Sequence, residues 1–134
     1  MAEVTEIGGI GQVYAQRLAE ARIGTTQVLL KRGATSEGRE KIAKKAGVSA
    51  RRVLTWVNKA DLMRIKGVGK EYANLLDAAA VHTVKQLAQQ RPDRVTEKLL
   101  TVNEERYLVQ RVPGQETVEE WIKAARHLPP ILST

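Results

Sequence analysis

Apolar residues recur at helical spacing along most of the chain, and no stretch alternates apolar and polar residues as a half-buried strand would. Over residues 12–22 the apolar positions share one face, with Arg17 and Glu20 on the other side, so the pattern predicts an amphipathic helix. The positions on the apolar face are Val13, Tyr14, Leu18 and Ala21.

Threonine, serine and glycine residues predict where three more helices of the first half begin and end. Short hydroxyl side chains accept hydrogen bonds from the amides of a first helical turn, and glycine closes many helices. The first helix is predicted over 26–32, with Thr25 as its cap and Gly33 at its end. The second covers 37–46, with Ser36 as its cap and Gly47 at its end. The third covers 50–59 and is capped by Ser49. The last of these helices carries the apolar stripe Val53, Trp56, Val57 and Ala60.

Five further helices are predicted in the second half of the chain. They cover 70–79, 83–89, 93–100, 104–111 and 117–127. Proline lacks the amide hydrogen that a helix interior needs, so Pro92, Pro113-Gly114 and Pro129-Pro130 are predicted to break or stop these helices. The sequence therefore predicts an all-α fold, a compact bundle of short helices.

The two halves of the chain repeat one another. The stretch Ile7-Gly8-Gly9-Ile10-Gly11-Gln12 returns as Ile65-Lys66-Gly67-Val68-Gly69-Lys70 at an offset of 58, and the stripe around Trp56 returns around Trp121 at an offset of 65. The second copy thus holds seven additional residues. We interpret the chain as an internal duplication of two units, 1–63 and 64–134, the first of which contains a basic helical segment, 31–59.

Composition narrows the chemistry that the chain can perform. Of 134 residues 43% are hydrophobic, which is enough for a core, and the lack of cysteine excludes disulfides and thiolate metal sites. Two histidines, His82 and His127, are too few for a histidine metal cluster. The first residues are acidic and no apolar run reaches the length of a membrane span, so we expect a cytoplasmic protein with no cofactor, metal, membrane association or small-molecule substrate.

Positive charge is concentrated in one part of the chain. The formal charge is +7 and the pI is near 9.9. Residues 31–59 hold nine Lys or Arg against Glu37 and Glu40, a net +7, so the remaining residues sum to zero. Such a segment favours a polyanionic partner, although a solvated basic face is the simpler interpretation. Its candidate contacts are Lys44, Lys45, Arg51 and Arg52.

The two glycine-rich turns are candidate sites for a phosphate group. Glycines on either side of one apolar residue let the backbone bend sharply, and a helix that follows at once adds unsatisfied amides and the positive end of its dipole. In the second turn Lys66 and Lys70 flank the glycines, whereas Gly8 and Gln12 occupy these places in the first. The candidate residues are Lys66, Gly67, Val68, Gly69 and Lys70, with Gly9 and Gly11 of the first turn. Alternatively, both glycine pairs only permit tight helix packing.

The stretch from Ile65 to Leu76, which reads Ile-x-Gly-Val-Gly-x-x-x-Ala-x-x-Leu, and the residues 81–88 after it resemble the helix-hairpin-helix modules of DNA repair, recombination and transcription proteins. Taken with the stretches around Trp56 and Trp121, the chain is similar to a bacterial family of unknown function built from two such modules. The resemblance implies a bundle of tandem helix-hairpin-helix (SAM-like) units. It also implies that the turn amides and a following basic residue hold the DNA backbone without reading its sequence.

Two further patterns have both a functional and a structural interpretation. Ala43, Gly47, Ser49, Val53 and Trp56 have the spacing of a helix-turn-helix, which would place Arg51, Arg52 and Thr55 in a major groove. A basic face that touches phosphates only is the alternative. Trp56 and Trp121 could stack on nucleic-acid bases, but their equivalent places in both copies favour positions in the core. The same interpretation applies to Tyr14 and Tyr72.

No enzymatic activity is predicted. Helix-hairpin-helix glycosylases need a catalytic aspartate beyond the turn, whereas Asp77 falls inside the helix after it and Asp93 lies beside a proline. The expected function is sequence-independent binding of nucleic acid, preferably duplex DNA. The alternative is a module for protein interaction or self-association with no nucleic-acid role.

Overall fold

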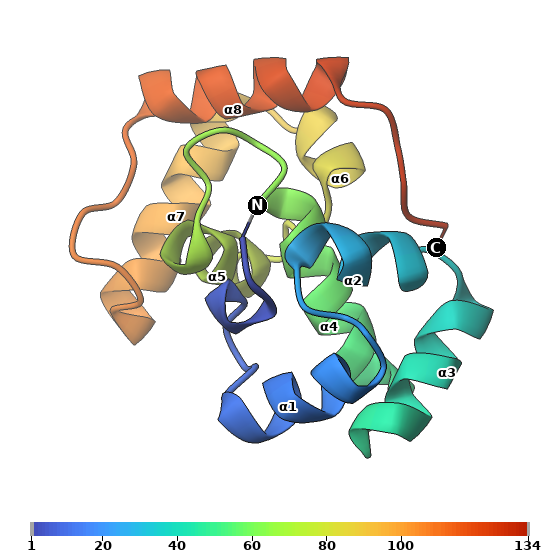
Figure 1. Cartoon of the computed structure of the whole chain (residues 1–134). Coiled ribbons are helices and arrows are strands. Elements are labelled where there is room, and N and C mark those ends of the chain that lie inside the picture. The colour runs from blue at the N-terminus through green and yellow to red at the C-terminus, as the bar shows by residue number, and fades with distance from the viewer. Residues whose placement is uncertain (1, 134) are drawn as a thin grey trace. The chain divides into compact units, whose positions relative to one another are not determined.

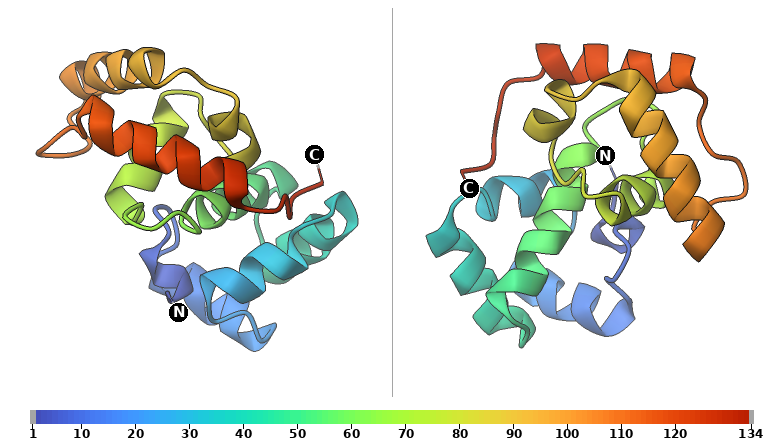
Figure 2. Two further views of the ribbon diagram at one scale, coloured as in Figure 1. Left: turned by 90° about the horizontal axis from the view of Figure 1, so that it is seen from above. Right: turned by 180° about the vertical axis from the view of Figure 1, so that it is seen from behind.

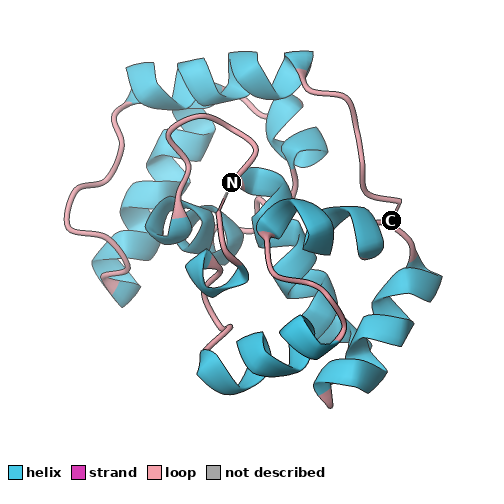
Figure 3. Ribbon diagram, viewed as in Figure 1, coloured by secondary structure: helices cyan, strands magenta, loops and turns pink. Residues whose placement is uncertain are grey.

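The computed structural model describes residues 2–133, and within this range every regular element is helical, as predicted (Figure 1). No β-strand occurs there (Figure 3). Within the same range a single antiparallel bridge joins Glu3 and Thr25. None of the helices is long and apolar enough to cross a membrane. The elements are η1 (Val4–Glu6), α1 (Gln12–Glu20), α2 (Thr26–Arg32), α3 (Ser36–Ala46), α4 (Ala50–Leu62), α5 (Lys70–Ala78), α6 (Val84–Ala88), α7 (Pro92–Arg106) and α8 (Gln115–His127).

These helices divide into two compact units. Unit 1 comprises Met1–Asp61 with Ile131–Thr134, and unit 2 comprises Leu62–Pro130. The residues from Ile131 onward therefore belong with the first unit, whereas the predicted division placed them in 64–134. In this return segment the Ser133 amide donates to the Ala34 carbonyl at 2.8 Å.

Unit 1 is built from η1 and α1 to α4. Helix α3 packs against α1 and α2, and η1 lies against the same two helices. The predicted stripe of α4 is buried, with Trp56 only 2% exposed, so α4 supplies much of the apolar interior. One expectation for α1 is wrong, because Val13 is 62% exposed. It stands in the first turn of the helix, where Tyr14 beside it packs against Trp56.

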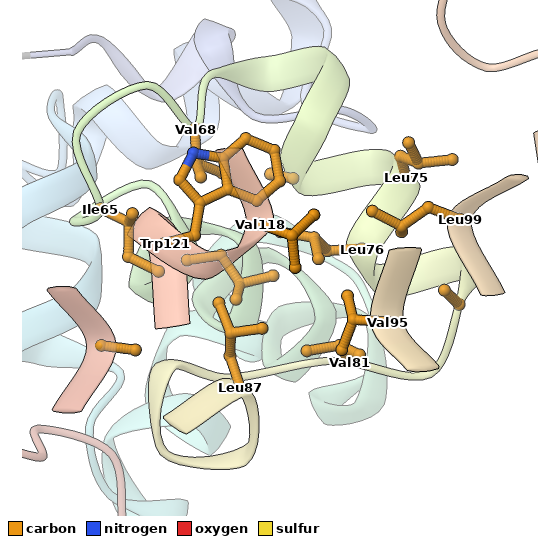
Figure 4. Packing of buried hydrophobic residues seen from close by; sticks show 14 of the residues in the cluster. Ile65, Val68, Leu75, Leu76, Val81, Leu87, Val95, Leu99, Val118 and Trp121 are labelled. Carbon is orange, nitrogen blue, oxygen red and sulfur yellow. The ribbon is translucent and has the colours of Figure 1, made fainter. Parts of the chain in front are cut away.

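Unit 2 has an apolar core to which all its helices contribute. Helix α8 packs across α6 and α7, and α5 packs against α7 (Figure 2). Figure 4 shows side chains of this core, including Ile65 and Val68 of the glycine turn together with Trp121 of α8. The turn is therefore fixed to its unit by apolar side chains on either side of Gly67.

Two of the three predicted hydroxyl caps are confirmed by hydrogen bonds, whereas α4 ends at Leu62, three residues beyond its predicted end, and α8 begins at Gln115, two residues before its predicted start. The Thr25 hydroxyl accepts from the Val28 amide at 3.2 Å, and the Ser49 hydroxyl accepts from the Arg52 amide at 3.1 Å. The cap predicted at Ser36 is wrong by one residue. Thr35 takes that role, accepting from the Gly38 amide at 3.0 Å, because its extended backbone points the hydroxyl at the first turn of α3.

Helix α7 replaces two predicted helices, 93–100 and 104–111. It runs without a break from Pro92, which stands at its start rather than as a break within it, to Arg106. The Asn103 side chain donates to the Val109 carbonyl at 3.0 Å and accepts from the Val109 amide at 2.9 Å, which ties the following loop to the helix. Tyr107 ends the helix in the left-handed conformation, with φ of 47°.

Candidate nucleic-acid interface

The second glycine turn is a tight β-turn with a glycine where the backbone requires one. The Val68 amide donates to the Ile65 carbonyl at 3.0 Å, and Gly67, the third residue, has φ of 92°, the pattern of a type II turn. Ile65 and Val68 are buried, while Lys66 and Gly67 between them are exposed. The bend thus presents its backbone to solvent.

Several amides after this turn have no internal acceptor. Gly69 caps α5 with extended backbone and no side-chain hydrogen bond. The Ala73 amide donates the first hydrogen bond of the helix, to the Gly69 carbonyl at 2.9 Å. Within residues 2–133 the amides of Gly69, Lys70, Glu71 and Tyr72 therefore keep their hydrogen atoms free for an outside acceptor. Together with the helix dipole they can hold an anion.

The side chains around these amides carry mixed charge. Lys66 and Lys70 are exposed, and neither forms an ion pair or hydrogen bond with any described residue. Glu71, also exposed, places one carboxylate in the first turn of α5. Two ammonium groups against one carboxylate leave the second turn with a net positive charge.

The first glycine turn has the same backbone but different side chains. The Ile10 amide donates to the Ile7 carbonyl at 3.1 Å, Gly9 has φ of 97°, and Gly11 caps α1 with extended backbone. Gly8 is buried here, and its carbonyl accepts from Lys59 Nζ at 3.3 Å. The first turn thus exposes amides without a flanking lysine of its own.

A tryptophan lies beneath each turn. A Cβ atom added at Gly9 would lie 3.4 Å from Trp56 Nε1, and one added at Gly67 would lie 3.4 Å from Trp121 Nε1. A tyrosine packs on each indole, with ring centroids 5.4 Å apart for Tyr14 and Trp56 and 5.3 Å apart for Tyr72 and Trp121. Both tryptophans are buried, which confirms them as core residues and not base-stacking platforms.

The basic segment of unit 1 is only partly available to a partner. Arg39 is buried, donating to the carbonyls of Gly33 at 2.9 Å and Ser133 at 3.3 Å, and Lys59 is bound to Gly8. The predicted contacts are exposed and lie on either side of the α3–α4 corner at Gly47. They are Lys44 and Lys45 at the end of α3 and Arg51 and Arg52 at the start of α4.

Arg17 is a cation of this corner that the sequence did not indicate. It lies 5.9 Å from the centre of the Tyr14 ring and donates to the Ala46 carbonyl at 2.9 Å. Arg52 lies equally far from that ring and donates to the Tyr14 hydroxyl at 3.1 Å. Neither guanidinium pairs with a carboxylate among the described residues. The only local feature that could have predicted this cluster is the i, i+3 spacing of Tyr14 and Arg17 on one helix face, because Arg52 lies 38 residues from Tyr14.

The predicted site residues form three groups, and each group lies within one unit. Lys66, Gly67, Val68, Gly69 and Lys70 make up the second turn in unit 2. Unit 1 holds Gly9 and Gly11 of the first turn and the four predicted cations of the α3–α4 corner. Among the described residues no three side chains are placed to hold a metal ion.

Comparison with known proteins gives one match over most of the chain. A family model described as a domain of unknown function (DUF4332) covers residues 8–128, which include the second turn, all of the first turn except Ile7, and every α-helix of the described residues. No curated protein and no solved structure matches the chain.

Proposed function

Because the chain belongs to the DUF4332 family, a domain of unknown function, we propose a function from the chemistry of its turns. The protein is a non-enzymatic module that binds duplex DNA through the phosphate backbone, with little preference for sequence. In this proposal the two units are copies of a helix-hairpin-helix module. The second turn makes the principal contact, and the basic corner of unit 1 adds to the affinity.

The observation that carries the proposal is the group of free amides at the start of α5, flanked by two unpaired lysines. A phosphate oxygen accepts several hydrogen bonds at once, and amides at a helix start are fixed donors that lose no side-chain entropy on binding. Lys66 and Lys70 would add Coulombic attraction. Since such contacts reach phosphates and not base edges, they carry no sequence information.

Salt dependence tests the proposal directly. If about four phosphates are contacted, affinity for a mixed-sequence duplex should fall by about two decades between 50 and 200 mM salt. Fluorescence anisotropy with labelled duplex and single-stranded probes measures this slope. Absence of binding to the duplex at low salt would reject the proposal.

Charge reversal at the second turn tests the position of the site. Lys66→Glu with Lys70→Glu should weaken duplex binding at least tenfold and equally for every sequence, because each reversal removes one phosphate contact and adds repulsion. Lys98→Glu with Lys123→Glu is the matched control, since both lysines are exposed residues of unit 2 that are not part of the turn. Equal losses in the two double variants would mean that only net charge matters.

A further inference from the structure

Unit 1 has a groove that the glycine turns do not use. It is lined by Ala21 and Ile23 after α1, by Arg32 of α2, and by Lys41, Ile42, Lys44 and Lys45 of α3, and its volume is about 350 Å³. Four of these seven residues are basic, yet the surface that the groove exposes is almost entirely apolar. The alkyl stems of the basic side chains must therefore form its walls, with the charged ends at the rim.

The charges at this rim are poorly neutralised within the protein. Arg32 donates to the Ala21 carbonyl at 3.1 Å, and Lys41 approaches Glu37 at 3.6 Å in a pair that is mostly exposed to solvent. Lys44 and Lys45 form no ion pair with any described residue. An apolar floor inside a rim of cations is complementary to a ligand that is apolar at its centre and acidic at its edges.

We propose that this groove binds an acidic peptide segment of a partner protein, in which an apolar side chain such as leucine is flanked by Asp or Glu. The apolar side chain would occupy the groove over Ala21, and the flanking carboxylates would pair with the ends of Lys41, Lys44 and Lys45. A duplex backbone offers phosphates and sugar C–H groups but no aliphatic side chain that could enter the groove, so the apolar floor favours a peptide. The inference does not depend on DNA binding at the second turn, which lies in unit 2.

Peptide binding tests the chemistry of the ligand. The probe is a fluorescein-labelled peptide in which glutamates alternate with leucines, and the control peptide has serine in place of leucine. The first should bind about tenfold tighter or more, because it buries an apolar side chain that the second lacks. Equal binding of the two peptides would overturn the proposal, since charge alone would then explain the attraction.

Substitutions in the groove test its position. Ala21→Phe fills the groove without changing the charge and should abolish the preference for the leucine peptide, whereas Ala19→Phe, on an exposed position outside the groove, should retain it. Lys41→Glu should weaken peptide binding more than Lys31→Glu, which makes the same change of charge away from the groove. If Ala21→Phe fails to fold, the comparison of Lys41→Glu with Lys31→Glu still tests the position of the peptide site.

Three further results would overturn the proposal. The first is wild-type peptide binding by a folded Ala21→Phe variant, because the peptide would then bind outside the groove. The second is a dimer, seen by analytical ultracentrifugation, that Ala21→Phe dissociates, because a second copy of the chain would then fill the groove. The third is an equal loss of duplex and peptide binding in Ala21→Phe. Loss of peptide binding with unchanged duplex binding supports the proposal, and a failure of duplex binding in the wild type leaves it intact.

Discussion

Gly67 and Gly69 stand two residues apart but serve different purposes. Gly67 has φ of 92°, a conformation that a side chain disfavours, and it lies over the Trp121 indole. Gly69 has φ of −99°, and nothing lies within 4 Å of the position that a Cβ atom would take. The backbone therefore requires glycine at the first position only.

Alanine at each position should separate these roles. Gly67→Ala should lower the free energy of unfolding by about 1–2 kcal/mol, the usual cost of a left-handed non-glycine residue. Gly69→Ala should change the free energy of unfolding by less than about 0.5 kcal/mol, because the freedom that it removes from the unfolded chain offsets the weaker N-cap that alanine makes. Urea denaturation followed by circular dichroism measures both. Equal destabilisation by the two variants would contradict the geometry.

Single residues also show how far the sequence predicts the candidate site. The turns and their flanking lysines were predictable because glycine spacing is local information. The cations around Tyr14 were not, since Arg17 and Arg52 meet at that ring only after α1 and α4 have packed into one unit. The prediction for Val13 was wrong for a related reason. Helical spacing predicts which residues share a face, but not how far the buried region extends toward a helix end.

At the scale of elements, α1 and α5 end in the same hydrogen-bond pattern. The amides of Ile23 and Val81 donate to the carbonyls of Leu18 and Leu76, five residues earlier, at 2.8 and 2.9 Å. This is the Schellman arrangement, whose left-handed position is usually glycine. Here Arg22 and Ala80 occupy it, with φ of 63° and 65°. Each helix end thus carries some backbone strain.

Replacing Ala80 with glycine should relieve this strain in α5. We expect Ala80→Gly to raise the free energy of unfolding by about 1 kcal/mol, because glycine adopts positive φ without steric cost. The same substitution in a helix interior, Ala124→Gly in α8, should lower it by a similar amount. Thermal denaturation of the two variants provides the measurement, and a destabilised Ala80→Gly variant would refute the expectation.

Helix α7 shows why element boundaries were harder to predict than element type. The predicted helix 93–100 begins within one residue of the observed start at Pro92, although Pro92 was predicted to break a helix and not to begin one. The end of α7 has no local signal, because Tyr107 is not a residue that normally closes a helix. The buried Asn103 amide, paired with the backbone of Val109, fixes the loop instead. Contacts of this kind depend on the packed unit and cannot be recognised from periodicity.

At the scale of the whole molecule, each unit contains one tryptophan, which makes its unfolding separately observable. Trp56 lies in unit 1 and Trp121 in unit 2, both buried. In a Trp121→Phe background the fluorescence reports unit 1, and in a Trp56→Phe background it reports unit 2. The contribution of the C-terminal segment 131–134 to the stability of unit 1 can therefore be measured in the intact chain, without separating the units.

Deletion of residues 131–134 should destabilise unit 1 more than unit 2. The deletion removes the bond from Ser133 to Ala34 and one acceptor of the buried Arg39 guanidinium, which together contribute about 1–3 kcal/mol. The urea midpoint reported by Trp56 should fall, and the midpoint reported by Trp121 should move less. Equal shifts, or no shift at Trp56, would show that the return segment does not stabilise unit 1 specifically.

The contact between Arg39 and Ser133 has a consequence for biosynthesis. Helices α1 to α4 leave the ribosome before unit 2, but one carbonyl that Arg39 binds is 94 residues further along and is translated only after all of unit 2. Until then the nascent first unit must hold a charged guanidinium with one of its two acceptors missing. Unit 1 is thus made before unit 2 but completed after it, and chaperones would meet it in that unfinished state.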